Sequence, residues 1–169
     1  MDAPAELTAF VRREHPRLVR AADLLLDDRA VAEEIAQEAL LRAAGRWEHV
    51  SGLAAPGGWA HRVAMNLATS QLRRRRVERR ARQRLAHRQD PPPGDPDAAM
   101  AVRDALRALP ERQRRVLVLR YVLGWTAVEI ADLERSSADA IRQQLRRARE
   151  AMREELGVEL DEEETTDAR

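Results

Sequence analysis

The sequence predicts an all-α protein made of two small helical domains joined by a flexible linker, and three observations support this. Hydrophobic residues make up 44% of the 169 residues but aromatic residues only 3%, so the core consists mainly of Leu, Val, Ile and Ala. This composition favours close-packed helices over a β-sandwich. Hydrophobic residues also recur at helical spacing along two long stretches. Between these stretches lies a polar, basic and proline-rich segment, which is typical of a domain boundary.

The first stretch, residues 1–76, predicts a compact domain of three helices. Pro16 is expected to kink or split the first helix, because proline lacks the amide hydrogen that an interior position donates. Asp27-Asp28 is typical of the start of a second helix, which we expect to end at Gly45.

The third helix of this domain is expected to begin near Trp59 and to continue into four arginines at 73–76. The small residues at 51–58 predict a loop before it. After it, residues 77–96 predict the linker, because the segment is polar and basic and three consecutive prolines at 91–93 enforce extended backbone.

The second stretch, residues 97–157, predicts a helix-turn-helix domain. Thr126-x-x-Glu129 is a capping box that opens a short helix. Ser136-Ser137 then interrupts the helical pattern before a long basic helix over 138–155. A short helix, a tight turn and a longer basic helix are typical of this motif. We expect residues 158–169 to form a disordered acidic tail.

Charge is distributed unevenly along the chain. Residues 154–169 carry eight acidic residues and one arginine, a net charge of −7, so the rest of the chain carries +8 against +1 for the whole. All 30 basic residues are arginine. A GC-rich genome alone would produce this composition, but the planar guanidinium group also suits phosphate and guanine.

Several functional classes find no support in the sequence. The absence of cysteine excludes a disulfide framework, a thiolate nucleophile and a cysteine-based metal site. The four histidines are scattered, and neither a metal-binding helical motif nor a glycine-rich phosphate loop occurs. We therefore expect no catalytic site, no metal and no cofactor. No apolar run reaches the roughly 20 residues that span a bilayer, and no signal peptide is recognisable, so we expect a cytoplasmic protein without membrane insertion.

Five segments together carry a resemblance to a known family. Residues 105–121, 125–131 and 137–148 resemble the opening, the first motif helix and the recognition helix of sigma region four. Residues 32–43 resemble the helix of sigma region two that docks on RNA polymerase, and residues 59–67 with the following arginines resemble the promoter-melting segment. Because both halves occur in the right order, the chain is identified as a member of the extracytoplasmic-function sigma factors of the sigma-70 family, in their actinobacterial form. The resemblance implies that the two predicted domains correspond to regions two and four.

Three departures from the family pattern stand out. The family usually has glycine in the motif turn, where this chain has Glu134-Arg135-Ser136. A residue other than glycine at a positive φ angle is uncommon, so we expect a reshaped or slightly destabilised turn. The recognition helix has Arg142-Gln143-Gln144 where the family often has Lys-Ser-Arg, and the loop before Trp59 has Gly57-Gly58 instead of phenylalanine. These departures leave the promoter sequence open.

The recognition helix is expected to contact the upstream promoter element. The residues assigned to this contact are Ser137, Arg142, Gln143, Gln144, Arg146 and Arg147. Arginine can read guanine and glutamine can read adenine, each pair contributing roughly 1–3 kcal/mol of discrimination. Ile141, Leu145 and Ala148 form the opposite, core-facing stripe. The alternative is an ordinary solvated face.

The promoter-melting segment is expected to contact the downstream element. The residues assigned to this contact are Trp59, Arg62, Asn66, Arg73, Arg74, Arg75 and Arg76. Asn66 matches the family position that reads an unstacked base. Trp59 shares its helical face and is either a core anchor or a stacking platform. The arginine run either neutralises phosphates or forms a solvated helix end that favours the helix dipole.

The resemblance implies that a polar stripe on the second helix contacts core polymerase. Its residues are Glu34, Gln37, Glu38 and Arg42. The alternative is an ordinary exposed stripe with an ion pair between Glu38 and Arg42.

The sequence therefore predicts a non-catalytic sigma factor that gives RNA polymerase its promoter specificity. The resemblance implies three partners, which are core RNA polymerase, promoter DNA and an anti-sigma factor. One alternative is a helix-turn-helix regulator that binds DNA independently of polymerase. A weaker alternative is a helical adaptor without a DNA function.

Overall fold

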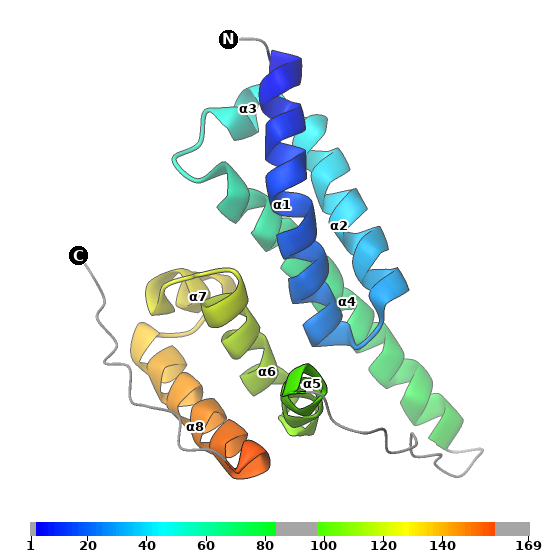
Figure 1. The fold of residues 1–169 in the computed structure, drawn as a ribbon, viewed down its shortest axis with the longest axis vertical. Helices are drawn as coiled ribbons and strands as arrows, with labels where there is room; N and C mark the ends of the chain where they lie inside the picture. The colour runs from blue at the N-terminus through cyan, green and yellow to red at the C-terminus, as the bar shows by residue number, and fades with distance from the viewer. Residues whose placement is uncertain (1–2, 84–97, 158–169) are drawn as a thin grey trace. The chain divides into compact units, whose positions relative to one another are not determined.

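The computed structural model describes residues 3–83 and 98–157, and all regular structure in these ranges is helical (Figure 1). This confirms the all-α prediction. The chain divides into two compact units, Met1–Asp95 and Pro96–Arg169. Residues 84–96 of the predicted linker and the predicted acidic tail lie outside the described residues. Within the described ranges, no helix combines the length and the apolar character that crossing a membrane requires.

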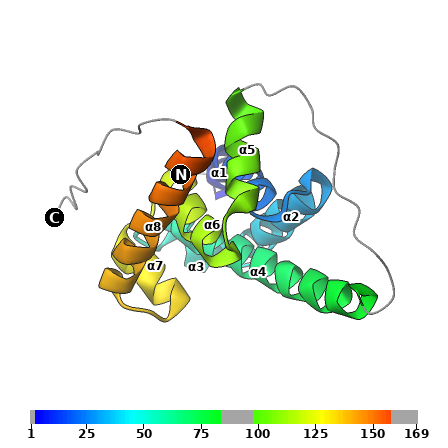
Figure 2. The ribbon, with the colours of Figure 1, turned by 90° about the horizontal axis from the view of Figure 1, so that it is seen from below.

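The first unit is a helical bundle in which α1 (Ala3–Leu26) packs against both α2 (Arg29–Ala44) and α4 (Pro56–Gln83) (Figures 1 and 2). A short helix, α3 (Trp47–Ser51), lies between α2 and the loop that precedes α4. Large side chains at the centre of this core are Leu18, Leu25, Val50 and Met65. Completely buried alanines fill the spaces between the helices, and they are Ala21, Ala22, Ala32, Ala36, Ala39, Ala43, Ala60, Ala64 and Ala68.

Pro16 does not split the first helix, contrary to one of the two outcomes expected for it. α1 runs unbroken from Ala3 to Leu26, with Pro16 on its exposed side. Phe10 before the proline, and Leu18 and Val19 after it, are all buried in the same core. Packing on both sides of the proline therefore maintains the helix despite the missing hydrogen bond.

The predicted start and end of the second helix are confirmed. Asp28 is the N-cap of α2, because its Oδ1 accepts a hydrogen bond from the Val31 backbone N–H at 3.1 Å. Gly45 is the C-cap. In the turn before α2, Asp27 has a φ of 54°, a left-handed conformation that aspartate adopts more readily than most residues.

The helix that carries the arginine run is longer at both ends than predicted. α4 begins at Pro56, so residues 56–58 of the predicted loop are helical, and proline is favourable at the first helical position. At its other end the helix reaches Gln83, so residues 77–83 continue α4 and do not belong to the linker. Arginine, alanine and glutamine are good helix formers, and polarity alone does not end a helix. The short α3 was not predicted, because five residues are too few to show a helical period.

In the second unit, α8 (Ala138–Leu156) packs against α5 (Ala98–Ala108), α6 (Glu111–Leu117) and α7 (Ala127–Glu134). A π-helix, η1 (Val118–Val122), continues α6. The core of this unit includes Val116, Leu119, Ile130, Ile141 and Ala148. These helices form the predicted helix-turn-helix.

The turn of the motif keeps a left-handed residue although it contains no glycine. Thr126 Oγ1 accepts a hydrogen bond from the Glu129 backbone N–H at 3.2 Å, and Glu129 Oε2 accepts one from the Thr126 N–H at 2.7 Å, which confirms the capping box. At the other end of α7, Arg135 adopts φ 52° and ψ 52°. Ser137 Oγ then accepts a hydrogen bond from the Ala140 N–H at 3.1 Å and opens α8.

Glycine at this left-handed position should stabilise the protein. Arg135→Gly is expected to raise the free energy of unfolding by about 0.5–1 kcal/mol, because a φ of 52° disfavours any residue with a Cβ. Chemical denaturation measures the change. Arg147→Gly, at an exposed position within α8, is the matched control and should lower stability by about 1 kcal/mol. A loss in both variants would show that the turn depends on the Arg135 side chain.

Candidate nucleic-acid interface

The exposed side of α8 gathers most of the residues expected to contact the upstream element. Ile141, Leu145 and Ala148 are buried, as their spacing predicted. The opposite side, which we call the α8 face, consists of the exposed residues Arg142, Gln143, Arg146 and Arg147. The helix therefore separates a core-packing side from a side rich in hydrogen-bond donors.

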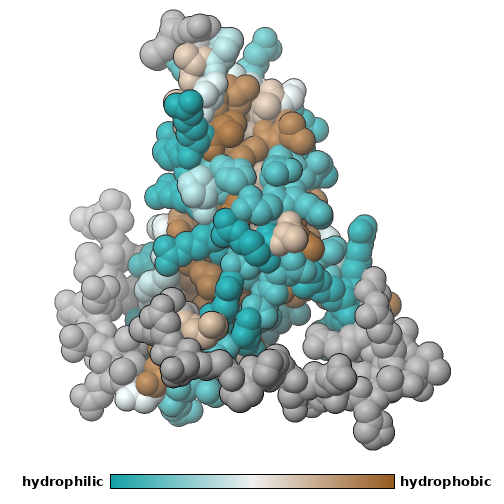
Figure 3. Space-filling model, turned by 45° about the vertical axis from the view of Figure 1, so that its right-hand side comes forward, coloured by the Kyte–Doolittle hydropathy of each residue, from teal (hydrophilic) through white to brown (hydrophobic). Residues whose placement is uncertain are grey.

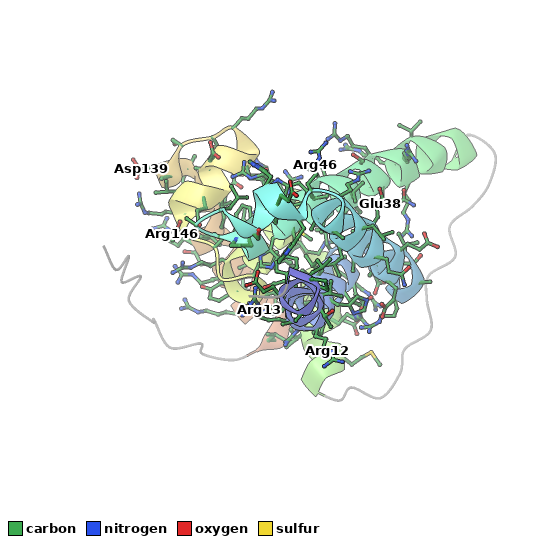
Figure 4. All side chains as sticks on the ribbon, turned by 90° about the horizontal axis from the view of Figure 1, so that it is seen from above. Arg12, Arg13, Glu38, Arg46, Asp139 and Arg146 are labelled. Atoms are coloured by element: carbon green, nitrogen blue, oxygen red, sulfur yellow. The ribbon has the colours of Figure 1, made fainter. Side chains whose placement is uncertain are left out.

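Two arginines of the α8 face form ion pairs along the helix. Arg142 Nη1 lies 2.6 Å from Asp139 Oδ1, and Arg146 Nε lies 3.5 Å from Glu150 Oε1. Figure 4 labels Asp139 and Arg146, which project from α8 toward solvent. Exposed ion pairs contribute roughly 0–1 kcal/mol each. Exchanging these carboxylates for phosphate or base edges therefore costs little.

Ser137 and Gln144 differ from the other residues assigned to this contact. The Ser137 hydroxyl is engaged as the N-cap of α8. Gln144 is half-buried, and its Oε1 is enclosed by protein without a hydrogen-bond partner. Both residues therefore border the α8 face rather than lie within it.

Asn66 occupies the middle of the exposed side of α4. With about 100° of rotation per residue, Trp59, Arg62 and Arg73 fall within roughly 40° of Asn66 around the helix axis. Asn66 and Arg73 are exposed, whereas Trp59 and Arg62 are half-buried. We call these four residues the α4 face. The arginines at 74 and 76 are exposed on either side of it.

Arg75 points away from the α4 face, unlike the other arginines of the run. Its Nη2 donates to Asp28 Oδ2 at 2.5 Å, and its Nη1 donates to the Leu26 carbonyl at 3.1 Å. Hydrogen bonds from the Val31 backbone N–H and then from Arg75 lower the pKa of the Asp28 carboxyl below its usual value. Arg75 lies about 180° from Asn66 around the helix. Arg75 therefore joins α4 to the turn between α1 and α2, and the DNA contact expected of it stays a prediction.

The polar stripe lies on the exposed side of α2. All four of its residues, Glu34, Gln37, Glu38 and Arg42, are exposed. The predicted ion pair is present, with Arg42 Nε 2.8 Å from Glu38 Oε1, and Glu38 is labelled in Figure 4. Leu41 is 67% exposed within the stripe and adds apolar surface to it. This residue was missed, because Leu40-Leu41 looks like core in the sequence and only Leu40 is buried.

A buried polar pair at the start of α4 was also missed. His61 Nε2 lies 2.9 Å from Glu14 Oε2, and both side chains are almost fully buried. Arg13 Nε lies 2.7 Å from the other carboxylate oxygen of Glu14. Glu14 and His61 are separated by 47 residues, so no local pattern could have paired them.

Within residues 3–83 and 98–157, no cluster of three or more His, Asp or Glu could hold a metal ion. On the face drawn in Figure 3, hydrophilic side chains divide the hydrophobic surface into separate patches. The candidate interaction sites are therefore the exposed helical faces described above.

The fold and these faces define a helix-turn-helix protein with a second helical domain. Residues 10–78 match the family described as Sigma-70 region 2, and residues 99–152 match the family described as Sigma-70, region 4.

Two relatives extend the match over nearly the whole chain. The RNA polymerase sigma-E factor of Streptomyces coelicolor is 31% identical over 158 residues, which cover 92% of this chain and 89% of the relative. The ECF RNA polymerase sigma factor SigL of Mycobacterium tuberculosis is 30% identical and covers 92% of this chain and 94% of its own. The chain therefore belongs to the sigma-70 family of RNA polymerase sigma factors and is of the extracytoplasmic-function type.

A solved structure supports the fold. The sigma factor RpoE from Bartonella quintana, crystallised in complex with the anti-sigma factor NepR, superposes with a TM-score of 0.75 at 20% sequence identity. The match covers 92% of this chain and 99% of that one.

Arg74 is exposed whereas Arg75 is bonded to the α1–α2 turn, and this difference predicts opposite effects of substitution. Arg75→Ala should lower the melting temperature by roughly 2–5 °C, because it removes both hydrogen bonds to the α1–α2 turn. Arg74→Ala should leave the melting temperature unchanged, since Arg74 is exposed. Thermal denaturation of the two purified variants measures this difference.

The salt dependence of DNA binding should rank the two variants the other way. Arg74→Ala should reduce the slope of log affinity against log salt by about 1, whereas Arg75→Ala should leave the slope unchanged. A salt titration of DNA affinity measures both slopes. A reduced slope for Arg75→Ala would mean that Arg75 contacts phosphate.

Proposed function

We propose that this sigma factor directs RNA polymerase to specific promoters by dividing recognition among three surfaces. The α8 face reads the upstream element, the α4 face holds the melted downstream element, and the polar stripe of α2 docks on core polymerase. The observation that carries the proposal is the α8 face, which presents arginine and glutamine directly after a capped helix-turn-helix turn.

The α8 face has the chemistry needed for a major-groove contact. Helix-turn-helix proteins place the N-terminal part of the second helix against base edges. Arg142 and Gln143 lie in the second turn of α8 and are exposed. Arginine pairs with guanine O6 and N7, and glutamine pairs with adenine N6 and N7. Arg146 and Arg147 lie one turn further along, where they suit phosphates at the edge of the groove.

The α4 face suits an unpaired strand. The Asn66 amide offers both a donor and an acceptor to the edge of an unstacked base, and Trp59 offers part of an aromatic ring one helical repeat away. Arg73, Arg74 and Arg76 supply exposed positive charge for the adjoining phosphates. The same helix thus combines base reading with charge neutralisation.

The polar stripe of α2 suits a protein partner. Its charged residues surround the exposed Leu41, and an apolar centre with a polar rim is the usual anatomy of a protein interface. We assign this stripe to core polymerase.

Run-off transcription with purified core polymerase on a genomic DNA library tests the proposed function. Transcripts that start at sites sharing two sequence elements are expected. The second candidate, a regulator that binds DNA without polymerase, is supported by the helix-turn-helix alone. It predicts that the full-length chain binds specific DNA by itself and does not bind core polymerase in the absence of DNA.

Base reading by α8 predicts a specific loss of promoter affinity. Arg142→Ala and Gln143→Ala should each weaken holoenzyme binding to the recovered promoters by about 1–3 kcal/mol. Neither substitution should change the affinity for core polymerase, because neither side chain belongs to the polar stripe of α2. Competition assays against scrambled DNA measure the effect. An equal loss on promoter and scrambled DNA would mean that these residues contact phosphate only.

We also propose regulation by an anti-sigma factor, as in the relative that was crystallised with one. The polar stripe of α2 and the α4 face must both meet other molecules during transcription, so a protein that covers them would block activity. A competing mechanism is self-inhibition, in which the acidic segment 158–169 mimics DNA and occupies the arginine-rich surfaces.

Removing the acidic segment distinguishes the two mechanisms. If regulation comes from a separate protein, deletion of residues 158–169 should change transcription by the purified holoenzyme less than twofold. Electrostatic competition by the segment would instead raise DNA affinity, most of all at low salt. Run-off transcription at low and high salt measures both. A severalfold rise in transcription would contradict control by a separate protein.

A further inference from the structure

Two of the polar contacts that join α4 to the rest of its unit lie on its core-facing side. Near its start, His61 Nε2 lies 2.9 Å from Glu14 Oε2 of α1. Near the end of the arginine run, Arg75 donates to Asp28 Oδ2 and to the Leu26 carbonyl in the α1–α2 turn. We call these the Glu14–His61 contact and the Asp28–Arg75 contact.

The two contacts lie on either side of Asn66 along α4. His61 and Arg75 are 14 residues apart, so they are separated by about 21 Å along the helix and lie within roughly 40° of each other around it. Asn66 lies between them along the helix and on the opposite side. Two directional contacts at this separation fix both the rotation of α4 about its axis and its position along it, whereas apolar packing alone permits small slips.

The Glu14–His61 contact places two polar side chains at a buried position that apolar side chains could otherwise fill. Burial by itself would raise the pKa of Glu14, but hydrogen bonds from Arg13 and His61 outweigh it and hold the pKa below its usual value. Burial lowers the pKa of His61, partly offset by Glu14 and reinforced by the charges of Arg17 and Arg13. A buried carboxylate with its partner adds little to the stability of the fold, because a protein with a well-packed apolar pair at the same position is often equally stable or more stable.

Gly57 supplies an independent sign that this site is shaped around the carboxylate. A Cβ on Gly57 would lie 3.0 Å from Glu14 Oε1 and 3.2 Å from Glu14 Cδ. The absence of a side chain at Gly57 therefore lets the carboxylate approach the first turn of α4. The glycine that departs from the family pattern at this position is accounted for by Glu14.

We propose that the Glu14–His61 and Asp28–Arg75 contacts are positioning contacts that hold the α4 face in register for unpaired promoter DNA. The inference rests on the proposed function, in which Asn66 reads an unstacked base. None of the four residues touches DNA. They act by setting where Asn66 and its neighbouring arginines lie.

The test separates position from stability. The double variant Glu14→Leu/His61→Leu should melt at or above the wild-type temperature and should bind core polymerase normally. It should bind a promoter fragment with a pre-opened, mismatched bubble roughly five- to tenfold more weakly, because the base contact is no longer in register. His61→Gln, which keeps a donor for Glu14, should restore binding to within about twofold, since the hydrogen bond is retained.

Arg75→Ala provides the second measurement if the double variant does not fold. It should weaken binding to the pre-opened fragment severalfold while leaving the salt slope unchanged, because no phosphate contact is lost. Affinity equal to wild type in both the double leucine variant and Arg75→Ala would overturn the proposal. So would losses that follow the melting temperature across all variants.

Asn66→Ala distinguishes failure of the inference from failure of the proposed function. If Asn66→Ala weakens binding to the pre-opened fragment but the positioning variants do not, the inference alone fails. If Asn66→Ala has no effect, the proposal that α4 holds melted DNA is contradicted, and so is the inference that rests on it.

Discussion

Close packing of α1, α2 and α4 through buried alanines is the interaction on which the first unit depends. With few aromatic residues available, the helices fill their core by approaching one another closely, and the methyl groups of the nine completely buried alanines permit that approach. One aromatic contact joins α1 to α3, with the rings of Phe10 and Trp47 5.0 Å apart. Because each long helix uses one side for this packing, its opposite side remains available. The polar stripe of α2 and the α4 face are both such outer sides.

A buried ion pair supports the motif turn at which the chain departs from the family pattern. In the second unit, Arg115 of α6 pairs with Glu134, the last residue of α7, and the Glu134 side chain is only 5% exposed. A carboxylate at a helix C-terminus opposes the helix dipole, and the guanidinium of Arg115 offsets this effect. The pair secures the end of α7 directly before the left-handed Arg135. Each unit thus contains a buried charged contact, Glu14–His61 in the first and Arg115–Glu134 in the second.

Local signals in the sequence predicted much of the fold and only part of the site. The caps at Asp28, Thr126 and Ser137 were predictable, because each hydrogen bond joins residues three apart in the chain. The core-facing and exposed sides of α8 followed from helical spacing alone. The contacts of Arg75 and Glu14 were not predictable, since their partners lie 47 residues away and are brought close only by the packing of α4 against α1 and the turn that follows α1. Periodicity says which side of a helix is buried, but it does not say which polar group meets another there.

The π-helix η1 constrains the length of the helix-turn-helix unit. Within it, the Leu123 N–H donates to the Val118 carbonyl at 3.2 Å, five residues back, so this turn holds one residue more than an α-helical turn. Loss of one residue here would rotate whatever follows by about 100° relative to α6. Leu123 and Trp125, which are now buried, would leave their places in the core. The fold should therefore tolerate substitution of the exposed residues of the α8 face much more easily than deletion of one codon in η1.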